Sequence, residues 1–349
     1  MANSVVGVDI GSTSLRAVEV EDPNKPRPTV VRLHEVPLPE GAANRGEVLE
    51  PNTVAQALKL LWSQARFASR NVVLGVGNQR VLARDFAVPR ASLAHIRESL
   101  PFEAQDLLPI PVADALLDFY PVWEQQTESG PMVNGLLIAA VKEVVLGNVK
   151  ATEIAGLRTV DVDVIPFALN RALINRQDAR GTIALIDIGA NTTNVVIAKD
   201  GAPHFVRIIP TGGAELTRQL AQSMEFETPK AEHLKRRLGM AKQVANDEEH
   251  RAVQVIYQLG NELLLSLRNT LNYFVNTRPG ESVRRIILTG GGSQLPGFAQ
   301  ALSEYTRIQV VAGDPFASVK VAKSIPTNEL AERHSSYAVA LGLALGSAA

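Results

Sequence analysis

The sequence contains no cysteine. Disulfides, zinc ribbons and thiol nucleophiles are therefore excluded, and the absence suits a reducing compartment. The six histidines are scattered without the spacing of metal ligands, so we expect no histidine metal site. Neither sign of charge is in excess: 35 basic and 36 acidic residues give a formal net charge of −1. Bulk binding of nucleic acid is therefore not expected.

Long apolar runs are also missing. The longest, such as 338–345, fall far short of the roughly 20 residues that span a bilayer. The N-terminus opens directly into a strand-like run, so we expect no signal peptide. These features predict a cytoplasmic protein that reaches a membrane only through partners. A composition that is 46% hydrophobic and 20% charged indicates an ordered chain, and 349 residues suggest two domains.

An internal repeat relates the two halves of the chain. The run 5–11, VVGVDIG, recurs in outline at 183–189 as IALIDIG. Each copy leads through small hydroxyl or amide residues into a second β-run, at 15–20 and at 195–198. Each copy therefore predicts a β-hairpin with an Asp-Ile-Gly turn.

The two hairpin turns have the composition of phosphate-binding loops, because glycine allows close backbone approach and short hydroxyl groups add donors. Asp9 and Asp187 cannot contact phosphates directly, but a carboxylate can hold the water shell of magnesium. One such turn alone is compatible with an ordinary hairpin, so the prediction depends on the pair. The candidate phosphate-binding residues are Gly11, Ser12, Thr13, Ser14 and the cation Arg16 in the first half, and Gly189, Ala190, Asn191, Thr192 and Thr193 in the second.

Three further features of the second half are candidates for nucleotide contacts. The segment 289–293, TGGGS, lies between a β-run and a helical pattern, although taken alone it is also compatible with a bare tight turn. It fits neither the Walker nor the dinucleotide motif. Gly212 and Gly213 precede a helical stretch. Glu232 and Lys235 lie three residues apart on a charged helix, which is also the spacing of an ordinary surface ion pair.

The ordered set of motifs resembles the actin, Hsp70 and sugar-kinase superfamily. Within it the chain is most similar to the PilM family of type IV pilus assembly proteins, with the FtsA cell-division family second. The PilM family usually has lysine where this sequence has Arg16. The resemblance covers nearly the whole chain and rests on VGVDIGSTSLRAVEV at 6–20, on 98–122 and 136–173, on IDIGANTTNVVIAKDG at 186–201, on AEHLKRRLG at 231–239 and on ILTGGGSQLPGF at 287–298.

The resemblance implies an α/β fold of the actin-like (ribonuclease H-like) class, a duplicated two-domain ATPase fold with a small inserted α/β subdomain. The expected divisions are 1–88 with 160–180 and 332–349 for subdomain IA, 89–159 for the inserted subdomain IC, 181–226 with 282–331 for subdomain IIA, and 227–281 for subdomain IIB.

ATP and magnesium are the cofactors that the resemblance implies. Asp9 and Asp187 would hold the magnesium through water, and the two turns with Gly212 and Gly213 would hold the phosphates. No catalytic residue is assigned, and slow ATP hydrolysis stays open. The residues expected at the nucleoside are Glu232, Lys235, Gly290, Gly291, Gly292 and Ser293.

The implied function is a scaffold of type IV pilus assembly. It would dock the cytoplasmic N-terminal segment of PilN, a membrane-anchored pilus protein, near the inserted subdomain, and would contact pilus motor or platform proteins. It would be recruited in this way to the cytoplasmic face of the cell membrane, and a homo-oligomer stays open.

Two alternatives are weighed against the scaffold. A small-molecule kinase needs a general base and sugar-binding polar residues, and no such set is found between Asp161 and Arg180. An FtsA-like filament former needs a basic amphipathic helix that binds the membrane, whereas this sequence ends in GSAA after an apolar run. The scaffold is therefore preferred.

Overall fold

The structure is a computed structural model that describes residues 4–128, 130–175, 177, 179–240, 244–278, 280–326 and 334–346. Its framework is two large β-sheets with the same internal order, which confirms the duplication predicted from the repeat. The first sheet has the order β10-β6-β1-β2-β3-β16, and the second has the order β13-β12-β11-β14-β15. In each sheet, three antiparallel strands that are consecutive in sequence lie beside parallel strands added later in the chain.

The strands of the first sheet are β1 (Ser4–Ile10), β2 (Ser14–Glu21), β3 (Thr29–Pro37), β6 (Asn71–Val76), β10 (Arg158–Val164) and β16 (Lys320–Val321). Those of the second are β11 (Thr182–Ile188), β12 (Thr193–Lys199), β13 (Ala202–Ile209), β14 (Arg285–Thr289) and β15 (Gln309–Ala312).

Helices cover both faces of each sheet, which explains why the central strands read as continuous apolar runs. The outer face of the first sheet is covered by α1 (Pro51–Ala65) and α3 (Lys142–Ile154). Between the two sheets lie α4 (Ile165–Asn170) and α10 (Ala338–Ala344), whose small residues allow close packing. At Gly7 in β1 a Cβ would overlap the carbonyl oxygen of Ala340 in α10, so only glycine fits there.

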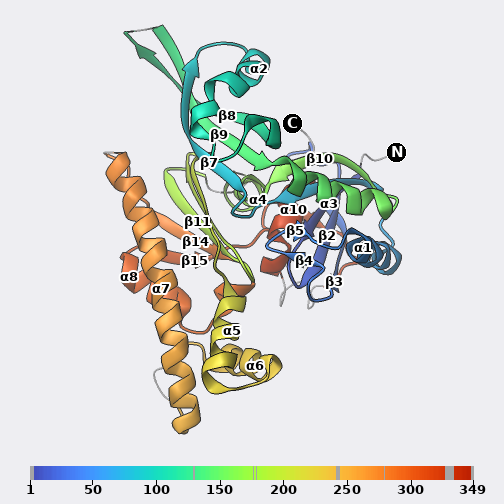
Figure 1. Cartoon of the computed structure of the whole chain (residues 1–349), viewed down its shortest axis with the longest axis vertical. Helices are drawn as coiled ribbons and strands as arrows, with labels where there is room; N and C mark the ends of the chain where they lie inside the picture. Colours follow the sequence, from blue (N-terminus) through green and yellow to red (C-terminus); the bar gives the residue numbers. More distant parts are fainter. Residues whose placement is uncertain are drawn as a thin grey trace.

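The far face of the second sheet is covered by helices of the second half, including the long helix α7 (Figure 1). Helices α7 (Asp247–Thr277) and α8 (Phe298–Thr306) lie on this face, and α5 (Gly213–Met224) and α6 (Thr228–Leu238) pack on α7 beyond the end of the sheet. Shorter elements complete the chain: the ribbon β4 (Ala43–Asn44) and β5 (Glu47–Val48), the π-helix η3 (Arg171–Asn175), and the 3₁₀ turns η4 (Gly291–Gln294) and η5 (His334–Tyr337).

A third, smaller sheet is inserted into the first half and projects from the body (Figure 1). Its strands, in the order β7-β9-β8, are β7 (Val81–Pro89), β9 (Gly130–Val141) and β8 (Ala115–Thr127). Helix α2 (Leu93–Glu103) packs on β8, and the short turns η1 (Gln105–Leu107) and η2 (Val112–Asp114) connect them.

The extent of this sheet differs from the expected division 89–159. Strand β7 pairs with β9 from Val81 onward, so the small sheet begins earlier. Helix α3 packs on α1, and β10 pairs with β6, so the part of the chain after Val141 lies on the first large sheet. Pairing between distant strands, which local pattern does not reveal, sets both limits. The division expected at 331/332 lies outside the described residues.

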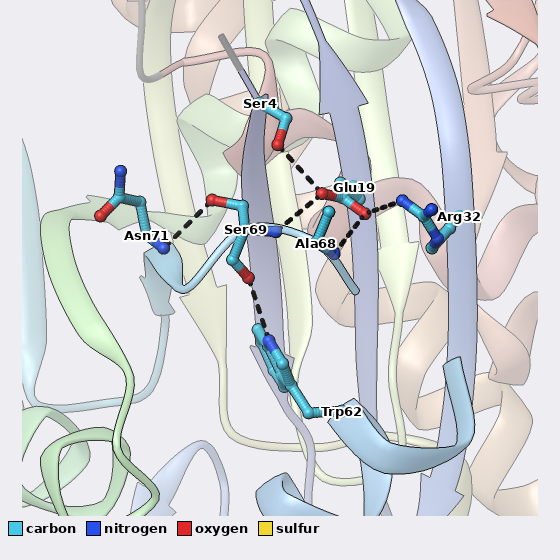
Figure 2. Close-up of polar contacts among 7 residues, drawn as sticks. All are labelled: Ser4, Glu19, Arg32, Trp62, Ala68, Ser69 and Asn71. Atoms are coloured by element: carbon cyan, nitrogen blue, oxygen red, sulfur yellow. Dashed lines mark hydrogen bonds and ion pairs between the residues drawn. The ribbon is translucent and has the colours of Figure 1, made fainter. Parts of the chain in front are cut away.

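A fully buried carboxylate fastens the loop after α1 to the first sheet (Figure 2). Oε1 of Glu19 accepts hydrogen bonds from Ser4 Oγ and from the Ser69 amide, both at 3.0 Å. Oε2 accepts from Arg32 Nη1 at 2.8 Å and from the Ala68 amide at 3.2 Å. A buried carboxylate is tolerated when its lone pairs are satisfied in this way.

Within the described residues, no helix combines the length and the apolar character needed to cross a bilayer.

We predict that Glu19→Gln lowers the free energy of unfolding by about 2–4 kcal/mol, because the amide group of glutamine presents hydrogens to donors that need an acceptor. Urea unfolding monitored by circular dichroism measures the change. Asp22→Asn is the matched control, because Asp22 pairs with Lys25 at the surface and should cost less than about 0.5 kcal/mol. Equal losses in the two variants would contradict the role given to Glu19.

Candidate functional site

The two predicted hairpin turns are present, and each closes in the same way. The Gly11 amide donates to the Ser14 carbonyl at 3.0 Å, and the Gly189 amide donates to the Thr192 carbonyl at 2.9 Å. We call residues 11–13 the first turn and residues 189–192 the second turn. Asp9 and Asp187 are the next-to-last residues of the strands that lead into these turns, and both are buried.

The partner opposite each carboxylate is set by strand register. Asp9 lies opposite Arg16 in the β1–β2 pair, and Asp187 lies opposite Asn194 in the β11–β12 pair. Arg16 Nη1 is 3.5 Å from Asp9 Oδ2, while Asn194 Nδ2 donates to Asp187 Oδ2 at 2.9 Å. The equivalent positions of the two hairpins thus supply a cation on one side and a neutral amide on the other.

Burial raises the cost of ionising both carboxylates. Burial raises the pKa of Asp187 to about 6, and the charge of Asp9 adds to the rise, against the lowering effects of Asn194 and Arg16. Burial also raises the pKa of Asp9, although Arg16 partly offsets it. Two buried acids whose charged forms are disfavoured form a site where a divalent cation would stabilise both charges.

Further contacts bring the second turn next to the first half. Asn191 Nδ2 of the second turn lies 3.4 Å from Asn44 Oδ1 in the β4–β5 ribbon. The adjoining Arg45 amide donates to Ser12 Oγ of the first turn at 2.9 Å. The two turns therefore flank one ribbon and open toward a common region.

Several amides of the turns are available to a ligand. Within the described residues, the amides of Ser12 and Thr13 have no acceptor, and the same holds for those of Ala190 and Asn191. Successive free amides in a turn form an anion-binding arrangement. The turns thus retain donors that an incoming phosphate could use.

Three of the predicted phosphate-binding side chains are instead engaged or enclosed within the protein. Thr193 is fully buried and donates to the Thr211 carbonyl at 2.7 Å. Arg16 is held by Asp9 and, at 3.0 Å, by Glu35. Ser14 is buried, and its hydroxyl has no partner in the described part of the chain.

The glycine pair Gly212–Gly213 lies directly against the second turn. The Gly213 amide donates to the Gly189 carbonyl at 2.9 Å, and the Ala214 amide donates to the Ala190 carbonyl at 2.8 Å. A Cβ on Gly212 would lie 2.5 Å from the Gly189 oxygen. The pair therefore supports the turn, and the amides of Gly213 and Ala214 are already used.

Glu232 and Lys235 form more than a surface ion pair. Lys235 Nζ contacts Glu232 Oε2 at 2.7 Å and donates to the Gly213 carbonyl at 2.9 Å and to Thr217 Oγ1 at 2.8 Å. Burial alone would raise the pKa of Glu232, but hydrogen bonds from Lys235, Thr217 and Arg236 outweigh it and lower the pKa to about 2. This cluster ties α6 to the start of α5.

The late glycine loop, Gly290–Ser293, closes behind the second hairpin, because β14 runs parallel to β11. Gly290 has a φ of +86°, and a Cβ there would lie 2.5 Å from Asp187 Oδ1. A Cβ on Gly292 would overlap the side chain of Ile188. Ser293 Oγ donates back to the Gly290 carbonyl at 2.6 Å, while Gly291 faces open space.

The elements of the second half that were predicted for the site lie close together. A Cβ on Gly213 would lie 3.6 Å from Gly292 Cα and 3.7 Å from Lys235 Nζ. Among the described residues, no group of three or more acids and histidines is placed to hold a metal ion. Four residues that were not predicted from the sequence also support the site: Glu35, Asn44, Asn194 and Thr217.

Comparison with known proteins identifies the fold. A family model described as type IV pilus assembly protein PilM matches residues 7–348. A solved PilM-PilN type IV pilus biogenesis complex has a TM-score of 0.87 and 31% identity, covering 99% of this chain and 98% of that one. MreB5 of Spiroplasma citri bound to ADP has a TM-score of 0.52 at 13% identity, covering 97% and 94%. The actin-like fold predicted from the sequence is confirmed.

A curated relative extends the comparison to cell division. Cell division protein FtsA of Bacillus subtilis is 22% identical over 353 residues, which cover 89% of this chain and 78% of that protein.

We predict that Asp187→Asn stabilises the protein in the absence of metal. Because the folded-state pKa is raised from 3.8 to about 6, the charged carboxylate destabilises the fold above that pH, and the penalty disappears as the pH falls toward 3.8. Asparagine keeps an acceptor for Asn194, so the free energy of unfolding should rise by about 1–3 kcal/mol at pH 7.5. Urea unfolding in EDTA at pH 7.5 and pH 5 tests this, and a gain that does not shrink at pH 5 contradicts it.

A second prediction concerns the glycine pair. Gly212→Ala should destabilise the protein by about 1–3 kcal/mol, because its Cβ meets backbone atoms that cannot move aside. Gly213→Ala is the adjacent control, since its Cβ meets only ordinary van der Waals contacts. Thermal unfolding of the two variants measures the contrast. Similar melting temperatures would show that Gly212 is not needed for the second turn.

Proposed function

The chain belongs to the type IV pilus assembly protein PilM family, and we propose that it is a nucleotide-binding scaffold of that assembly, which holds Mg-ATP between its two hairpin turns. The observation that carries the proposal is the pair of buried carboxylates, Asp9 and Asp187, beside turns with free amides. Two carboxylates that hold the water shell of magnesium, with amides for phosphate oxygens, are the donor set that Mg-ATP requires.

The nucleoside half of the ligand would lie on the second half of the protein. Lys235 and Glu232 present a positioned cation and carboxylate beside the glycine pair. The late glycine loop leaves open space at Gly291. These groups would contact the ribose and base, while the first turn and Asp9 complete the phosphate side.

A scaffold is favoured over a small-molecule kinase by the two described acids between 161 and 180. Asp163 is held by Arg171 at 2.9 Å, and its carboxylate also accepts from the Val164 amide. Asp161 accepts from the Val162 amide. Asp163 is therefore engaged by Arg171 and is not free to act as a general base for a substrate hydroxyl, while Asp161 lies exposed at the surface. ATP hydrolysis, if it occurs, would be slow, because no residue is assigned to position water.

Docking of PilN is the proposed task of this scaffold. The PilM-PilN complex, to which this chain is similar along its whole length, supports PilN as the partner. We place the docked cytoplasmic N-terminal segment of PilN near the inserted sheet, which would bring the protein to the cytoplasmic face of the membrane. Contact with pilus motor or platform proteins is part of the same proposal.

The nucleotide is tested by incubating purified protein with Mg-ATP, removing free nucleotide and identifying what stays bound by chromatography. We expect retained, largely intact ATP that is lost with EDTA and in Asp187→Asn, because the second carboxylate is needed for magnesium. Asp200→Asn is the control, since Asp200 lies at the other end of the same hairpin and accepts from the Gly181 amide. Absence of retained nucleotide would contradict the ATP proposal. Rapid turnover stimulated by a metabolite would indicate a kinase.

The partner is tested with a synthetic peptide of the cytoplasmic N-terminal segment of PilN from the same organism. We expect saturable one-to-one binding in calorimetry, because the chain matches the PilM-PilN complex over its full length. A scrambled peptide is the control. Binding no stronger than that of the scrambled peptide, with and without Mg-ATP, contradicts the docking proposal.

A further inference from the structure

A hollow of about 510 Å³ lies on the second half of the protein, between the C-terminal parts of α7 and α8. These two helices contact each other, and α8 also packs on β15 (Figure 1). The hollow is at the opposite end of α8 from the late glycine loop, so it is separate from the site described above. Its lining residues are Arg268, Asn272, Glu304, Tyr305, Thr306 and Arg307.

The charges around the hollow are unbalanced. Within the described residues, neither Arg268 nor Arg307 has a carboxylate partner, whereas Arg236, Arg237 and Arg278 are each paired with an acid. Arg268 instead lies over the ring of Tyr305, with its guanidinium carbon 5.5 Å from the ring centroid. The one acid on the rim, Glu304, accepts from Gln300 Nε2 at 2.8 Å along its own helix.

The rim leads directly into a free sheet edge. Strand β15 begins two residues after Arg307 and pairs with β14 on one side. On its other side it pairs with no strand in the described part of the chain. An exposed strand edge is a template for an added strand, which gains backbone hydrogen bonds while its side chains select the sequence. Tyr305, which is 38% exposed, adds apolar surface at the rim.

We propose that this surface docks an extended acidic segment of a partner protein, which adds a strand to β15 and places carboxylates on Arg268 and Arg307. Guanidinium groups bind carboxylates through charge-assisted, two-pronged hydrogen bonds. Tyrosine and arginine around a hollow are also the residue types that dominate binding energy at protein interfaces. Nucleic acid fits less well, because the rim carries Glu304 and the whole chain has a net charge of −1.

The probe for this site is a fluorescently labelled peptide of alternating valine and glutamate, six residues long, with a valine-lysine peptide as the charge control. Fluorescence anisotropy with the full chain should show binding of the acidic peptide only. The double substitution Arg268→Gln and Arg307→Gln should weaken binding at least roughly tenfold, which corresponds to about 1.4 kcal/mol. Arg251→Gln removes an exposed charge from the N-terminal part of α7 and should leave binding unchanged.

Backbone pairing is tested separately with two acidic peptides that are N-methylated at alternate residues. One of the two should lose binding roughly tenfold, because N-methylation removes the donors along one edge of the strand. An excess of PilN segment should not displace the acidic probe, so the outcome does not depend on the proposed PilN docking.

Four results would overturn the proposal. They are binding of the acidic peptide weaker than about 1 mM, equal binding of the lysine peptide, equally arginine-dependent binding of a single-stranded oligonucleotide, and a dimer of the chain that dissociates in the double variant. The last result would assign the surface to a second copy of this chain.

Discussion

The candidate site is built around two buried carboxylates of like charge. One lies near the end of the central strand of each half. Asp9 and Asp187 are each disfavoured in the charged form by burial, and the charge of Asp9 adds to the cost at Asp187. Arg16 and Asn194 offset only part of that cost. Such a pair destabilises the fold unless a ligand uses it, so its presence at the junction of the two halves supports the proposed magnesium site.

The surrounding structure supports these carboxylates. Gly290 leaves room for the side chain of Asp187. The amides of Gly213 and Ala214 donate to carbonyls of the second turn and so stabilise it. Lys235 links the Gly213 carbonyl to Glu232 on α6. Because the supporting contacts come from α5, α6 and β14, movement of any one of these elements would alter the turn.

Much of the site could be predicted from the sequence, because the signals are local. The Asp-Ile-Gly turns, their flanking β-runs and the late glycine loop each occupy a few consecutive residues. By contrast, the burial of Thr193 and the hydrogen bond from Lys235 to the Gly213 carbonyl could not be predicted, because they depend on elements far apart in the chain. Asn194 could have been predicted from the repeat, since it occupies the position in the second hairpin that Arg16 occupies in the first. The extent of the inserted sheet depends on the β7–β9 register, which local pattern does not give.

Hydrogen–deuterium exchange of the full chain with and without Mg-ATP tests the central claim most directly, because it reports which amides the nucleotide protects. We predict that Mg-ATP protects the amides of residues 11–14, 189–193 and 290–293 together, since both halves of the protein contribute to one site. Protection confined to one half, or to surfaces away from Asp9 and Asp187, would contradict it.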